Sequence, residues 1–299
     1  MTVSAKVIAD SKFRDTRLIT LEVEMHRFVL PEFNTHRMIS RNFQSSRAVP
    51  VEKMIEQVRN DPAMPIHWGK NQSGMQAKEE VTNKINSLGH WIDAASSAAY
   101  YADKLKHHGL HKQIVNRILE PFMWTKGVVT ATEKSWKEFF KLRLHKDAQP
   151  EIYTLAEKIK EAVDSSEPYE LKEGEWHLPY LSFGLDGQGD AIYYISSEPD
   201  SYGGLFLEDA IKISSSCTAQ VSYRRLDDSL EKAVRVYDML NLPENGVYPE
   251  DPPHFSPTEH IAKASDCDFE LSGNFHSTDF IQYRKVLEKG LESKVIIEE

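Results

Sequence analysis

One stretch of the chain, THRMISRNFQSSR at residues 35–47, differs from an ordinary surface loop. It holds three arginines, one histidine, three serines and two carboxamides, and it contains no acidic residue. An arginine guanidinium presents a planar set of donors that matches phosphate and carboxylate groups, and serine hydroxyls can bind the same anion. We therefore expect residues 35–47 to bind an anion, for example a phosphorylated small molecule. The alternative interpretation is a solvent-exposed, arginine-rich loop.

The composition limits the classes of function that the chain can have. Its 299 residues are enough for one large domain or two ordinary ones, and 40% of them are apolar. The net charge is −10, whereas sequence-independent binding to a nucleic acid polymer needs a basic surface. We therefore expect no nucleic acid polymer as a partner, although a single nucleotide could bind in a locally basic pocket.

The patterns of secreted and membrane proteins are not found. Only two cysteines occur, Cys217 and Cys267, and there is no CxxC motif. Residues 1–10 lack the basic segment and long apolar run of a signal peptide. No apolar run approaches the length of a membrane-spanning helix. We expect a cytoplasmic protein without a membrane partner.

Hydrophobic periodicity predicts both strands and helices. Alternation predicts strands at residues 6–9 and 18–23, joined as a hairpin, and β-branched residues predict extended structure at 123–132. Apolar residues at three- and four-residue spacing predict a long helix from about residue 77 to residue 106. Further helices are expected at 51–58, 112–119, 134–143, 149–163, 230–240 and 279–291, with a strand at 268–271. Residues 165–204 are rich in glycine and are expected to be a linker or insertion.

Two arginines outside residues 35–47 lie in apolar surroundings. Arg117 is part of IVNRIL at residues 114–119, and Arg143 is part of FFKLRL at residues 139–144. Arginines with apolar neighbours are either members of structural ion pairs or part of a pocket wall. The sequence alone leaves both interpretations open.

The segment HFSPTEH at residues 254–260 combines two histidines and one glutamate. Its spacing differs from the H-E-x-x-H pattern of zinc sites, and we predict no metal site. Ser256 followed by Pro257 and an acid predicts the start of a helix. The free N–H groups of such a start could hold a phosphate.

Residues 36–47 resemble the signature of the flavin-dependent thymidylate synthases, R-H-R-x-x-S-x-N-E-x-S-x-R. Four further segments resemble other elements of that family. Residues 117–121 resemble A-R-x-x-L-P, and residues 139–152 resemble its late helix, N-F-x-x-L-R-x-x-x-x-A-Q-x-E-I. Residues 219–223, AQVSY, resemble A-R-V-S-Y, and residues 254–260 resemble H-x-[ST]-P-F-E-H. Together the five segments extend over most of residues 26–163 and 206–290.

The order of the motifs differs from that of the family. There, the A-R-V-S-Y and S-P-F-E-H elements precede the signature, whereas the similar segments here follow the late helix. We therefore expect a circularly permuted or internally rearranged relative, which is tolerable where chain ends lie close together. The resemblance implies an α+β fold with a mixed or antiparallel sheet and long helices. Residues 1–164 would carry the signature and the nucleotide-binding arginines, and residues 205–299 would complete the same flavin-binding domain.

The resemblance implies an enzyme, a methyltransferase that converts dUMP to dTMP. Members of the family bind FAD, use methylenetetrahydrofolate and NADPH as co-substrates, and assemble as homotetramers. No protein nucleophile attacks the uracil ring in this family, so the protein contributes positioning and electrostatics. This agrees with a chain that has no credible cysteine nucleophile.

Roles for individual residues follow from the same resemblance. Arg143 would face the pyrimidine and stabilise negative charge on it, while Ser45 and Arg47 would bind the nucleotide phosphate; these are the predicted catalytic residues. The predicted substrate-binding residues are Gln44, Ser45, Ser46, Arg47, Arg117 and Arg143. The predicted cofactor-binding residues are His36, Arg37, Ser40, Asn42, Thr132, Lys134, Glu138, Ser222, His254, Ser256 and Glu259.

Several positions depart from the family pattern. They are Thr35 and Gln220 in place of arginine, Phe43 in place of the acid, Glu138 in place of asparagine and Thr258 in place of phenylalanine. Lost arginines weaken contacts to phosphates unless Arg41, Lys134 or Arg224 substitutes for them. Two alternatives therefore stay open. One is a flavin-dependent C5-modifying enzyme, such as a hydroxymethylase, that acts on dUMP or dCMP; the other is a non-catalytic nucleotide- or flavin-binding protein.

Overall fold

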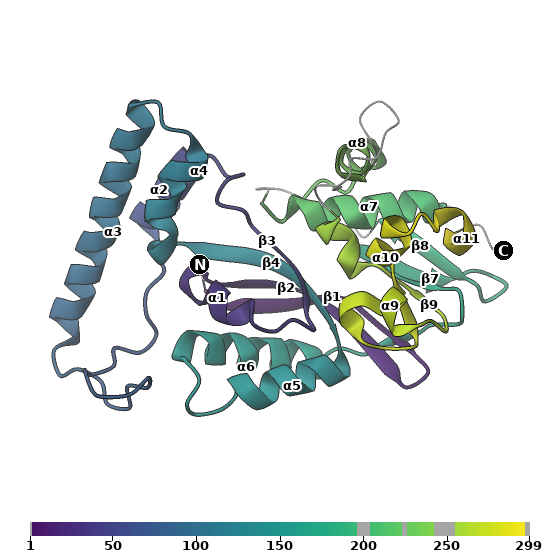
Figure 1. Cartoon of the computed structure of the whole chain (residues 1–299), viewed down its shortest axis with the longest axis horizontal. Helices are drawn as coiled ribbons and strands as arrows, with labels where there is room; N and C mark the ends of the chain where they lie inside the picture. Colours follow the sequence, from purple (N-terminus) through teal and green to yellow (C-terminus); the bar gives the residue numbers. More distant parts are fainter. Residues whose placement is uncertain (1, 196–203, 223–225, 242–254, 297–299) are drawn as a thin grey trace.

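A five-stranded sheet forms the centre of the computed structural model (Figure 1), which describes residues 2–195, 204–222, 226–241 and 255–296. The strands lie in the order β3-β4-β2-β1-β5. Neighbouring strands are antiparallel except β1 and β5, which are parallel. The expected α+β class with a mixed sheet and long helices is confirmed. The strands are β1 (Ser4–Phe13), β2 (Thr16–His26), β3 (Ser40–Phe43), β4 (Trp124–Thr132) and β5 (Tyr169–Glu170).

The predicted hairpin corresponds to β1 and β2, and its side chains alternate between the two faces of the sheet. In β2, Ile19 and Leu21 point to one face, and Leu18 and Thr20 point to the other. β4 pairs with β2 along its whole length and places Thr130 opposite Thr20. A shift of one residue would exchange the two faces, so this register fixes which side chains are buried on which side.

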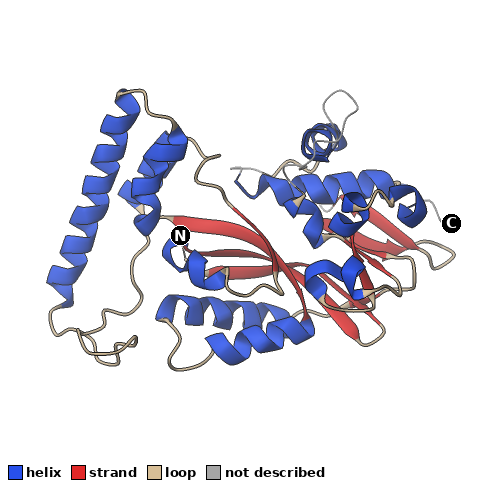
Figure 2. Ribbon diagram, viewed as in Figure 1, coloured by secondary structure: helices blue, strands red, loops and turns tan. Residues whose placement is uncertain are grey.

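Helices α5 (Glu133–Arg143) and α6 (Pro150–Asp164) cover one face of the sheet (Figures 1 and 2). Thr132 caps α5, because its side chain accepts a hydrogen bond from the Ser135 N–H. The core on this face is mainly apolar, and the buried Asp10, opposite Ile19, forms an ion pair with Arg17 on the same face. Its members include Ile19, Leu21, Val129, Ala131, Trp136, Phe139, Ile152, Leu155 and Ile159.

The opposite face of the sheet is covered by a smaller antiparallel sheet, β10-β9-β6, and by the elements around it. Leu18 packs there against Phe280 and Ala262. The strands involved are β6 (Trp176–His177), β7 (Leu181–Leu185), β8 (Ala191–Ile195), β9 (Ala262–Ala264) and β10 (Phe280–Gln282). The helices, including the 3₁₀ helices η3, η5 and η6, are α7 (Leu207–Ala219), η3 (Gln220–Ser222), α8 (Leu230–Asn241), η5 (Ser256–His260), α9 (Phe269–Ser272), η6 (Gly273–Phe275), α10 (Tyr283–Glu288) and α11 (Glu292–Ile296).

The proposed division of the chain at residues 165–204 stays a prediction. Within it, residues 165–195 contribute strands to both sheets, since β5 pairs with β1 and β6 pairs with β9. The hairpin of β7 and β8 packs against α7 in a core that also contains Trp176 and Tyr193. This part of the chain therefore packs against segments on either side of it.

Helices α2 (Val51–Asn60) and α3 (Lys84–His107) form an arm beside the sheet (Figure 1). The predicted long helix begins at Lys84 rather than near residue 77, because the Asn83 side chain caps it and residues 79–81 bond to residues 68–70. It ends before Gly109, whose φ is +80°. Among the described residues, none of the helices combines the length and apolarity needed to cross a membrane.

Short helices follow α3 and precede the signature. The predicted helix at residues 112–119 is split, with α4 (Lys112–Val115) followed by the 3₁₀ helix η2 (Asn116–Phe122). Ahead of the signature, the 3₁₀ helix η1 (Arg27–Val29) leads into α1 (Leu30–Phe33), with Pro31 in its first turn.

Two predictions near residue 270 are wrong. Residues 269–272 form helix α9 rather than a strand. The predicted helix at residues 279–291 starts instead as strand β10, which pairs with β9, and becomes helical only at Tyr283. Pairing with a distant strand overrides the local pattern in such short segments.

Candidate active site

The signature strand β3 presents alternate side chains to the two halves of the molecule. Ser40 is fully buried, and its Oγ accepts a hydrogen bond of 3.1 Å from Gln282 Nε2. Asn42 Nδ2 donates to the Thr218 carbonyl at 2.9 Å. Both contacts join the signature to residues of the C-terminal half, which are far away in the sequence.

The first half of the signature is held by the last turn of α5. Arg143 Nε donates to His36 Nε2 at 2.8 Å, and Arg143 Nη2 lies 3.3 Å from the Thr35 hydroxyl and the Glu32 carbonyl. The His36 ring packs edge-on against Phe139 with ring centroids 4.8 Å apart. The structure thus brings together His36 and Arg143, two residues that the sequence assigned to one site.

The contact with Arg143 also fixes the chemical state of His36. Burial, and then the charges of Arg143 and Arg41, lower the pKa of His36 to about 4. Since Nε2 accepts the hydrogen bond from Arg143, the proton of the neutral ring lies on Nδ1. Arg143 is therefore oriented by a neutral partner.

The second half of the signature is held by the start of η2. The buried Asn116 Nδ2 donates to the Ser46 carbonyl at 2.7 Å and to the Val49 carbonyl at 3.0 Å. Ser45 Oγ accepts from the Arg47 N–H at 3.3 Å, and the Arg47 side chain is exposed. Asn116 precedes Arg117, so the structure places the loop of Ser45, Ser46 and Arg47 beside the η2 turn that carries Arg117.

Arg117 shares an acidic partner with a second arginine. Arg117 Nη1 lies 2.8 Å from Glu120 Oε1, and Arg27 Nη2 lies 3.4 Å from the same oxygen. Arg27 Nη1 also donates to the Gln44 carbonyl at 2.8 Å. Two guanidinium groups on one carboxylate leave net positive charge next to the loop at residues 44–47. This arrangement supports the expectation of an anion site there.

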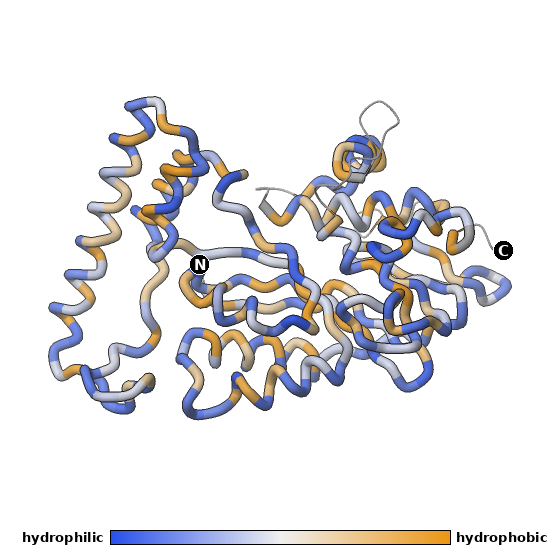
Figure 3. The backbone as a smooth tube through the Cα atoms, viewed as in Figure 1, coloured by the Kyte–Doolittle hydropathy of each residue, from blue (hydrophilic) through white to orange (hydrophobic). Residues whose placement is uncertain are grey.

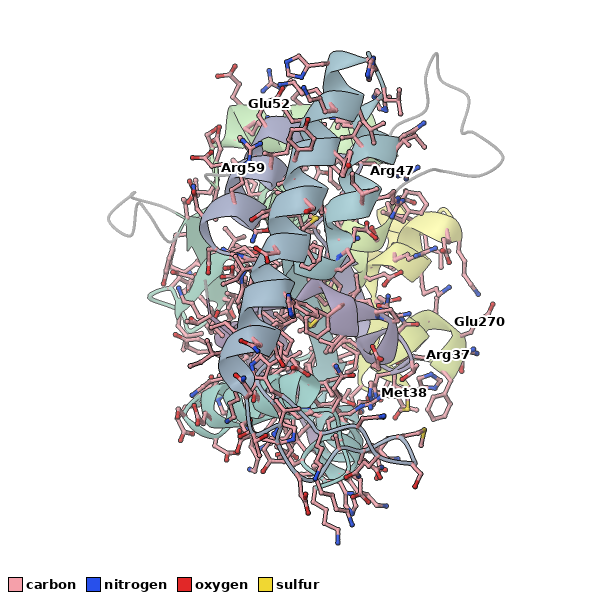
Figure 4. All side chains as sticks on the ribbon, turned by 90° about the vertical axis from the view of Figure 1, so that its left-hand side faces the viewer. Arg37, Met38, Arg47, Glu52, Arg59 and Glu270 are labelled. Atoms are coloured by element: carbon pink, nitrogen blue, oxygen red, sulfur yellow. The ribbon has the colours of Figure 1, made fainter. Side chains whose placement is uncertain are left out.

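Figure 4 shows that the two ends of the signature lie apart on one side of the molecule. Arg37 and Met38 project together from one edge, and Arg47 lies farther up the same side. The residues on either side of Arg47 bond to Lys112 of α4 and Asn116 of η2. Arg37 and Arg47 are both exposed, so each can reach a ligand or a partner from solvent.

A cleft of about 400 Å³ joins the signature to the AQVSY-like segment. Gln44 and Val221 both line it, together with Trp124 and Met54. Its rim carries both signs of charge, from Lys53, Lys126, Glu24, Glu56 and Asp61. Ser222 follows Val221 at the end of η3, and its side chain lies outside the described part of the structure.

The SPTEH segment forms η5, which packs against β3 and α7. Glu259 is paired with Arg284, and its backbone carbonyl accepts from the same Gln282 side chain that bonds Ser40. Burial raises the pKa of Glu259 despite the charge of Arg284. Ser256 is half-buried at the start of η5. His254 lies outside the described residues.

Three of the predicted cofactor-binding residues lie elsewhere. Thr132 is buried at the start of α5, and Lys134 is exposed beside it; both line a separate cleft of about 380 Å³. Glu138 is exposed on α5, with its carboxylate 4.0 Å from Lys141 Nζ. Their assignment to the cofactor stays a prediction.

The departures from the family pattern have structural roles here. Thr35 bonds the Glu32 carbonyl, and Gln220 is buried with hydrogen bonds to Ser216 and to the backbone of Asp227. Thr258 is buried and bonds the Phe255 carbonyl at 2.7 Å.

Phe43 has a close complement on the neighbouring strand. Its ring lies 5.4 Å from the Phe33 ring and covers Gly127, where an added Cβ would come within 2.3 Å of the ring.

Two residues of the site were missed by sequence reasoning. Asn116 holds the loop at residues 46–49, and Gln282 bridges Ser40 and the Glu259 carbonyl. A polar residue within the apolar segment IVNRIL was an available signal for Asn116. Nothing near Gln282 in the sequence distinguishes it.

The family is established by its sequence model. The model described as Thy1, thymidylate synthase complementing protein, matches residues 15–169, which is more than half of the chain. The chain therefore belongs to this family. The match includes the signature, Arg117 and the late helix, whereas the AQVSY and SPTEH segments lie beyond it. The permuted order of these two segments stays a prediction.

Two solved structures are similar over part of the chain. One is the UMP/dUMP methylase PolB from Streptomyces cacaoi bound with 5-Br dUMP, with 19% identity, a TM-score of 0.42, and coverage of 49% of this chain and 66% of that one. The match thus spans slightly less than two thirds of PolB. The other is Thymidylate Synthase X (ThyX) from Helicobacter pylori with FAD and dUMP, with 16% identity, a TM-score of 0.34, and coverage of 49% and 67%. No curated protein matches the chain.

The donors around β3 suit a flavin dinucleotide and a nucleotide phosphate in chemical type. Exposed guanidinium groups of Arg37 and Arg47 can bind phosphates. The buried Thr218 Oγ1, whose backbone carbonyl bonds Asn42, has no hydrogen-bond partner among the described residues. For metals, the described residues contain no group of three or more potential ligands.

Proposed function

We propose that this protein is a flavin-dependent enzyme that modifies carbon 5 of a pyrimidine nucleotide. Its reaction is the reductive methylation of dUMP to dTMP, with methylenetetrahydrofolate as the carbon donor and NADPH as the reductant. Membership in the Thy1 family supports the class of reaction. The observation that carries the proposal is the convergence on β3, where the signature meets the η3 and η5 segments and Arg143 is oriented by His36.

The residues divide into two groups by their expected roles, which are binding of the nucleotide and binding of the cofactor. Ser45, Ser46, Arg47 and Arg117, with Gln44, bind the nucleotide phosphate beside η2. Arg143 faces the pyrimidine and stabilises the negative charge that develops on its ring, because its guanidinium is fixed by a neutral histidine. Residues His36, Arg37, Ser40, Asn42, Thr132, Lys134, Glu138, Ser222, His254, Ser256 and Glu259 hold the cofactor.

Bound FAD, once reduced, supplies the hydride of this reaction. The protein's own residues bind the nucleotide and the cofactor, orient them, and exclude water from the site. Ser40 and Asn42 tie the signature strand to the C-terminal half, which fixes the strand under the bound groups. Glu259 supplies a carboxyl group at the flavin and folate side. Burial raises the pKa of this group, and its ion pair with Arg284 opposes that shift.

The first test is turnover with a defined product. Purified protein, reconstituted with FAD, should show flavin absorbance and convert dUMP to dTMP with methylenetetrahydrofolate and NADPH, as measured by mass spectrometry of the nucleotide. Arg143→Ala should lower kcat by about 10²–10³-fold while flavin stays bound, since one preformed electrostatic contact is lost. Arg59→Ala, which removes an exposed arginine of α2 (Figure 4), should retain wild-type turnover. Undiminished activity of Arg143→Ala would refute its role.

A second candidate function is C5 hydroxymethylation of dUMP or dCMP. Phe43 favours it, because the acid of the family signature is replaced here by a ring packed against Phe33 and Gly127. A product heavier than dTMP by one oxygen would establish this reaction and exclude methylation. Absence of both flavin binding and turnover would instead favour a non-catalytic nucleotide-binding protein.

Assembly into a homotetramer is part of the proposal. On α3, Ile85, Leu88 and Ile92 recur on one face and are 81%, 41% and 43% exposed. Hydrophobic residues recur along the whole helix (Figure 3), and an apolar face left open on one chain is suited to a second copy. Light scattering after size-exclusion chromatography should give four times the mass of the 34.3 kDa chain. Ile85→Glu should lower that mass.

A further inference from the structure

Five buried side chains form a continuous chain of hydrogen bonds through the molecule. Ser11 Oγ lies 2.9 Å from His177 Nδ1, and His177 Nε2 lies 2.7 Å from Thr20 Oγ1. Thr20 Oγ1 lies 2.7 Å from Thr130 Oγ1, and Thr130 Oγ1 lies 2.7 Å from His260 Nδ1. These are short distances for neutral donors and acceptors, so each link is well formed.

The chain of hydrogen bonds crosses both sheets. Thr20 and Thr130 are a directly opposite pair on β2 and β4, while Ser11 lies on β1. His177 comes from β6, and His260 comes from η5. Four of the five side chains are fully buried, and Ser11 is 6% exposed. No solvent reaches the middle of this hydrogen-bond chain. His177, Thr20 and Thr130 can therefore exchange protons only with their neighbours in it.

The two ends differ. Ser11 lines a cleft of about 260 Å³ at the edge of β1, where water can reach it. At the other end, His260 Nε2 is buried and has no hydrogen-bond partner among the described residues. A buried polar atom without a partner costs on the order of 1–3 kcal/mol, so such an atom needs an explanation. His260 follows Glu259, whose carbonyl is linked through Gln282 to Ser40 of the signature.

We propose that these side chains form a proton relay between the cleft at Ser11 and His260 Nε2, with His177, Thr20 and Thr130 as positioning residues. In one polarity, Ser11 donates to His177 Nδ1, His177 Nε2–H donates to Thr20, Thr20 donates to Thr130, and Thr130 donates to His260 Nδ1. His260 Nε2 then carries the proton and is a donor. This inference rests on the proposed function, in which Glu259, the residue before His260, lies at the flavin and folate side.

The relay step conserves protons and leaves no charge on the five side chains, because the negative charge of the ligand reappears as hydroxide in the cleft at Ser11. When an anionic group of a bound ligand takes the proton from His260 Nε2, Nδ1 receives the Thr130 proton, and each hydrogen further back moves by one position. Ser11 regains a proton from water in the cleft. The polarity of the chain is then reversed, and His260 Nε2 has become an acceptor.

Burial supports the neutral state that this relay needs. It lowers the pKa of His177 to about 4 and, together with the neighbouring His177, that of His260 to about 3. Both rings are therefore neutral at neutral pH. A neutral imidazole has one donor and one acceptor nitrogen, which is the requirement for passing a proton along a chain.

The test reads the tautomer of His260 in the ligand-free full-length protein. Solid-state NMR of protein labelled with ¹⁵N-histidine should show one neutral tautomer for His260, assigned by its loss in His260→Gln. Thr20→Val removes a link that does not touch His260, and it should convert the His260 signal to a mixture of tautomers. Thr20→Ser restores a hydroxyl and should restore the single tautomer. A His260 signal identical in wild type and Thr20→Val would overturn the proposal.

A second readout separates the relay from a purely structural role. Under the turnover conditions above, Thr20→Val should lower kcat on the order of 10²-fold without changing the KM for the nucleotide, and Thr20→Ser should recover it. Unchanged kcat in a folded Thr20→Val would also overturn the relay. His26→Gln, which alters a buried histidine bonded to the Met64 carbonyl outside the chain, is the control. If wild-type protein shows no turnover, the proposed function fails and the tautomer measurement alone decides the relay.

Discussion

The two faces of the central sheet differ in the kind of side chain that they bury. The face under α5 and α6 is mainly apolar, with Ile19, Leu21 and Val129 buried against the helices and the Asp10–Arg17 ion pair on the same face. The opposite face carries Thr20, Thr130 and Ser40, all fully buried and all hydrogen-bonded to residues of the C-terminal half. Ile19 and Leu21 on one face and Thr20 and Thr130 on the other are all fully buried, so burial alone does not distinguish these residues.

The difference indicates where stability and function are located. Apolar burial is non-directional and gains about 25 cal/mol per Å², so the helical face mainly stabilises the sheet, although Arg143 of α5 meets His36 at its end. Buried hydroxyl and imidazole groups add little net stability and require fixed geometry. The hydrogen bonds of such groups fix the geometry of this face, and Ser40 of the signature strand β3 lies on it opposite Thr130.

Acid should distinguish the two faces most strongly, because the two fully buried histidines, His177 and His260, are both bonded to threonines of the polar face. An unfolded histidine has a pKa of about 6.5, whereas the pKa values of His177 and His260 are lowered to about 4 and about 3. The unfolded state thus binds more protons between these values, and the free energy of unfolding falls as pH drops from about 6.5 towards 4. Urea titrations should show this slope, and His177→Gln should reduce it. A stability independent of pH in this window would contradict the neutral assignment.

Truncation on the apolar face should have the next largest effect, and it should be on stability alone. Leu155 is fully buried against the sheet, so Leu155→Ala should lower the free energy of unfolding by about 2–5 kcal/mol through lost transfer energy and a cavity. Flavin binding and the KM for the nucleotide should stay unchanged at temperatures where the variant is folded. Leu142→Ala, at a leucine of α5 that is 58% exposed, is the matched control and should have little effect on denaturant unfolding.

An intermediate effect is expected where the signature meets β4. Gly127→Ala would place a Cβ 2.3 Å from the Phe43 ring, and such overpacking costs about 1–3 kcal/mol. The double variant Phe43→Leu/Gly127→Ala should recover part of that loss, as measured by denaturant unfolding of the single and double variants. Additive losses in the double variant would show that the ring and the glycine are not complementary.

The smallest effect should come from the hydrogen bond between Asn42 of β3 and Thr218 of α7. Asn42→Ala removes the hydrogen bond from Nδ2 to the Thr218 carbonyl, which should cost about 0.5–1.5 kcal/mol. If Asn42 also contacts the flavin, the flavin dissociation constant measured by fluorescence titration should rise by more than this stability loss requires. Asn60→Ala, on the exposed end of α2, provides the control.

Much of the apolar face was predictable from the sequence, whereas the polar face was not. The alternation in β2 and the spacing of Ile152, Leu155 and Ile159 are local patterns, and each encodes its own burial. Thr20 and Thr130 read as ordinary strand residues, because their partners come from β6 and η5. Strand β10 was mistaken for helix for the same reason, since its structure depends on pairing with β9.

The candidate site shows the same division. The identities of His36 and the serines could be read from the signature and that of Arg143 from the late helix, and the structure does bring His36 and Arg143 together. The sequence could not show that one end of the signature contacts α5 and the other contacts η2, because this arrangement results from the pairing of β3 with β4. Gln282, which joins Ser40 to η5, acts across the sequence and leaves no local pattern.

The covering of the polar face has a consequence for the order of folding during synthesis. Strands β1, β2 and β4 and helices α5 and α6 all lie within the first 164 residues, whereas β9, β10 and η5 lie between residues 256 and 282. A nascent chain can therefore close its apolar face while the threonines of the other face still bond to water. The site is then the last part of this fold to assemble. During synthesis, the polar face of the sheet stays uncovered until η5 and β10 leave the ribosome.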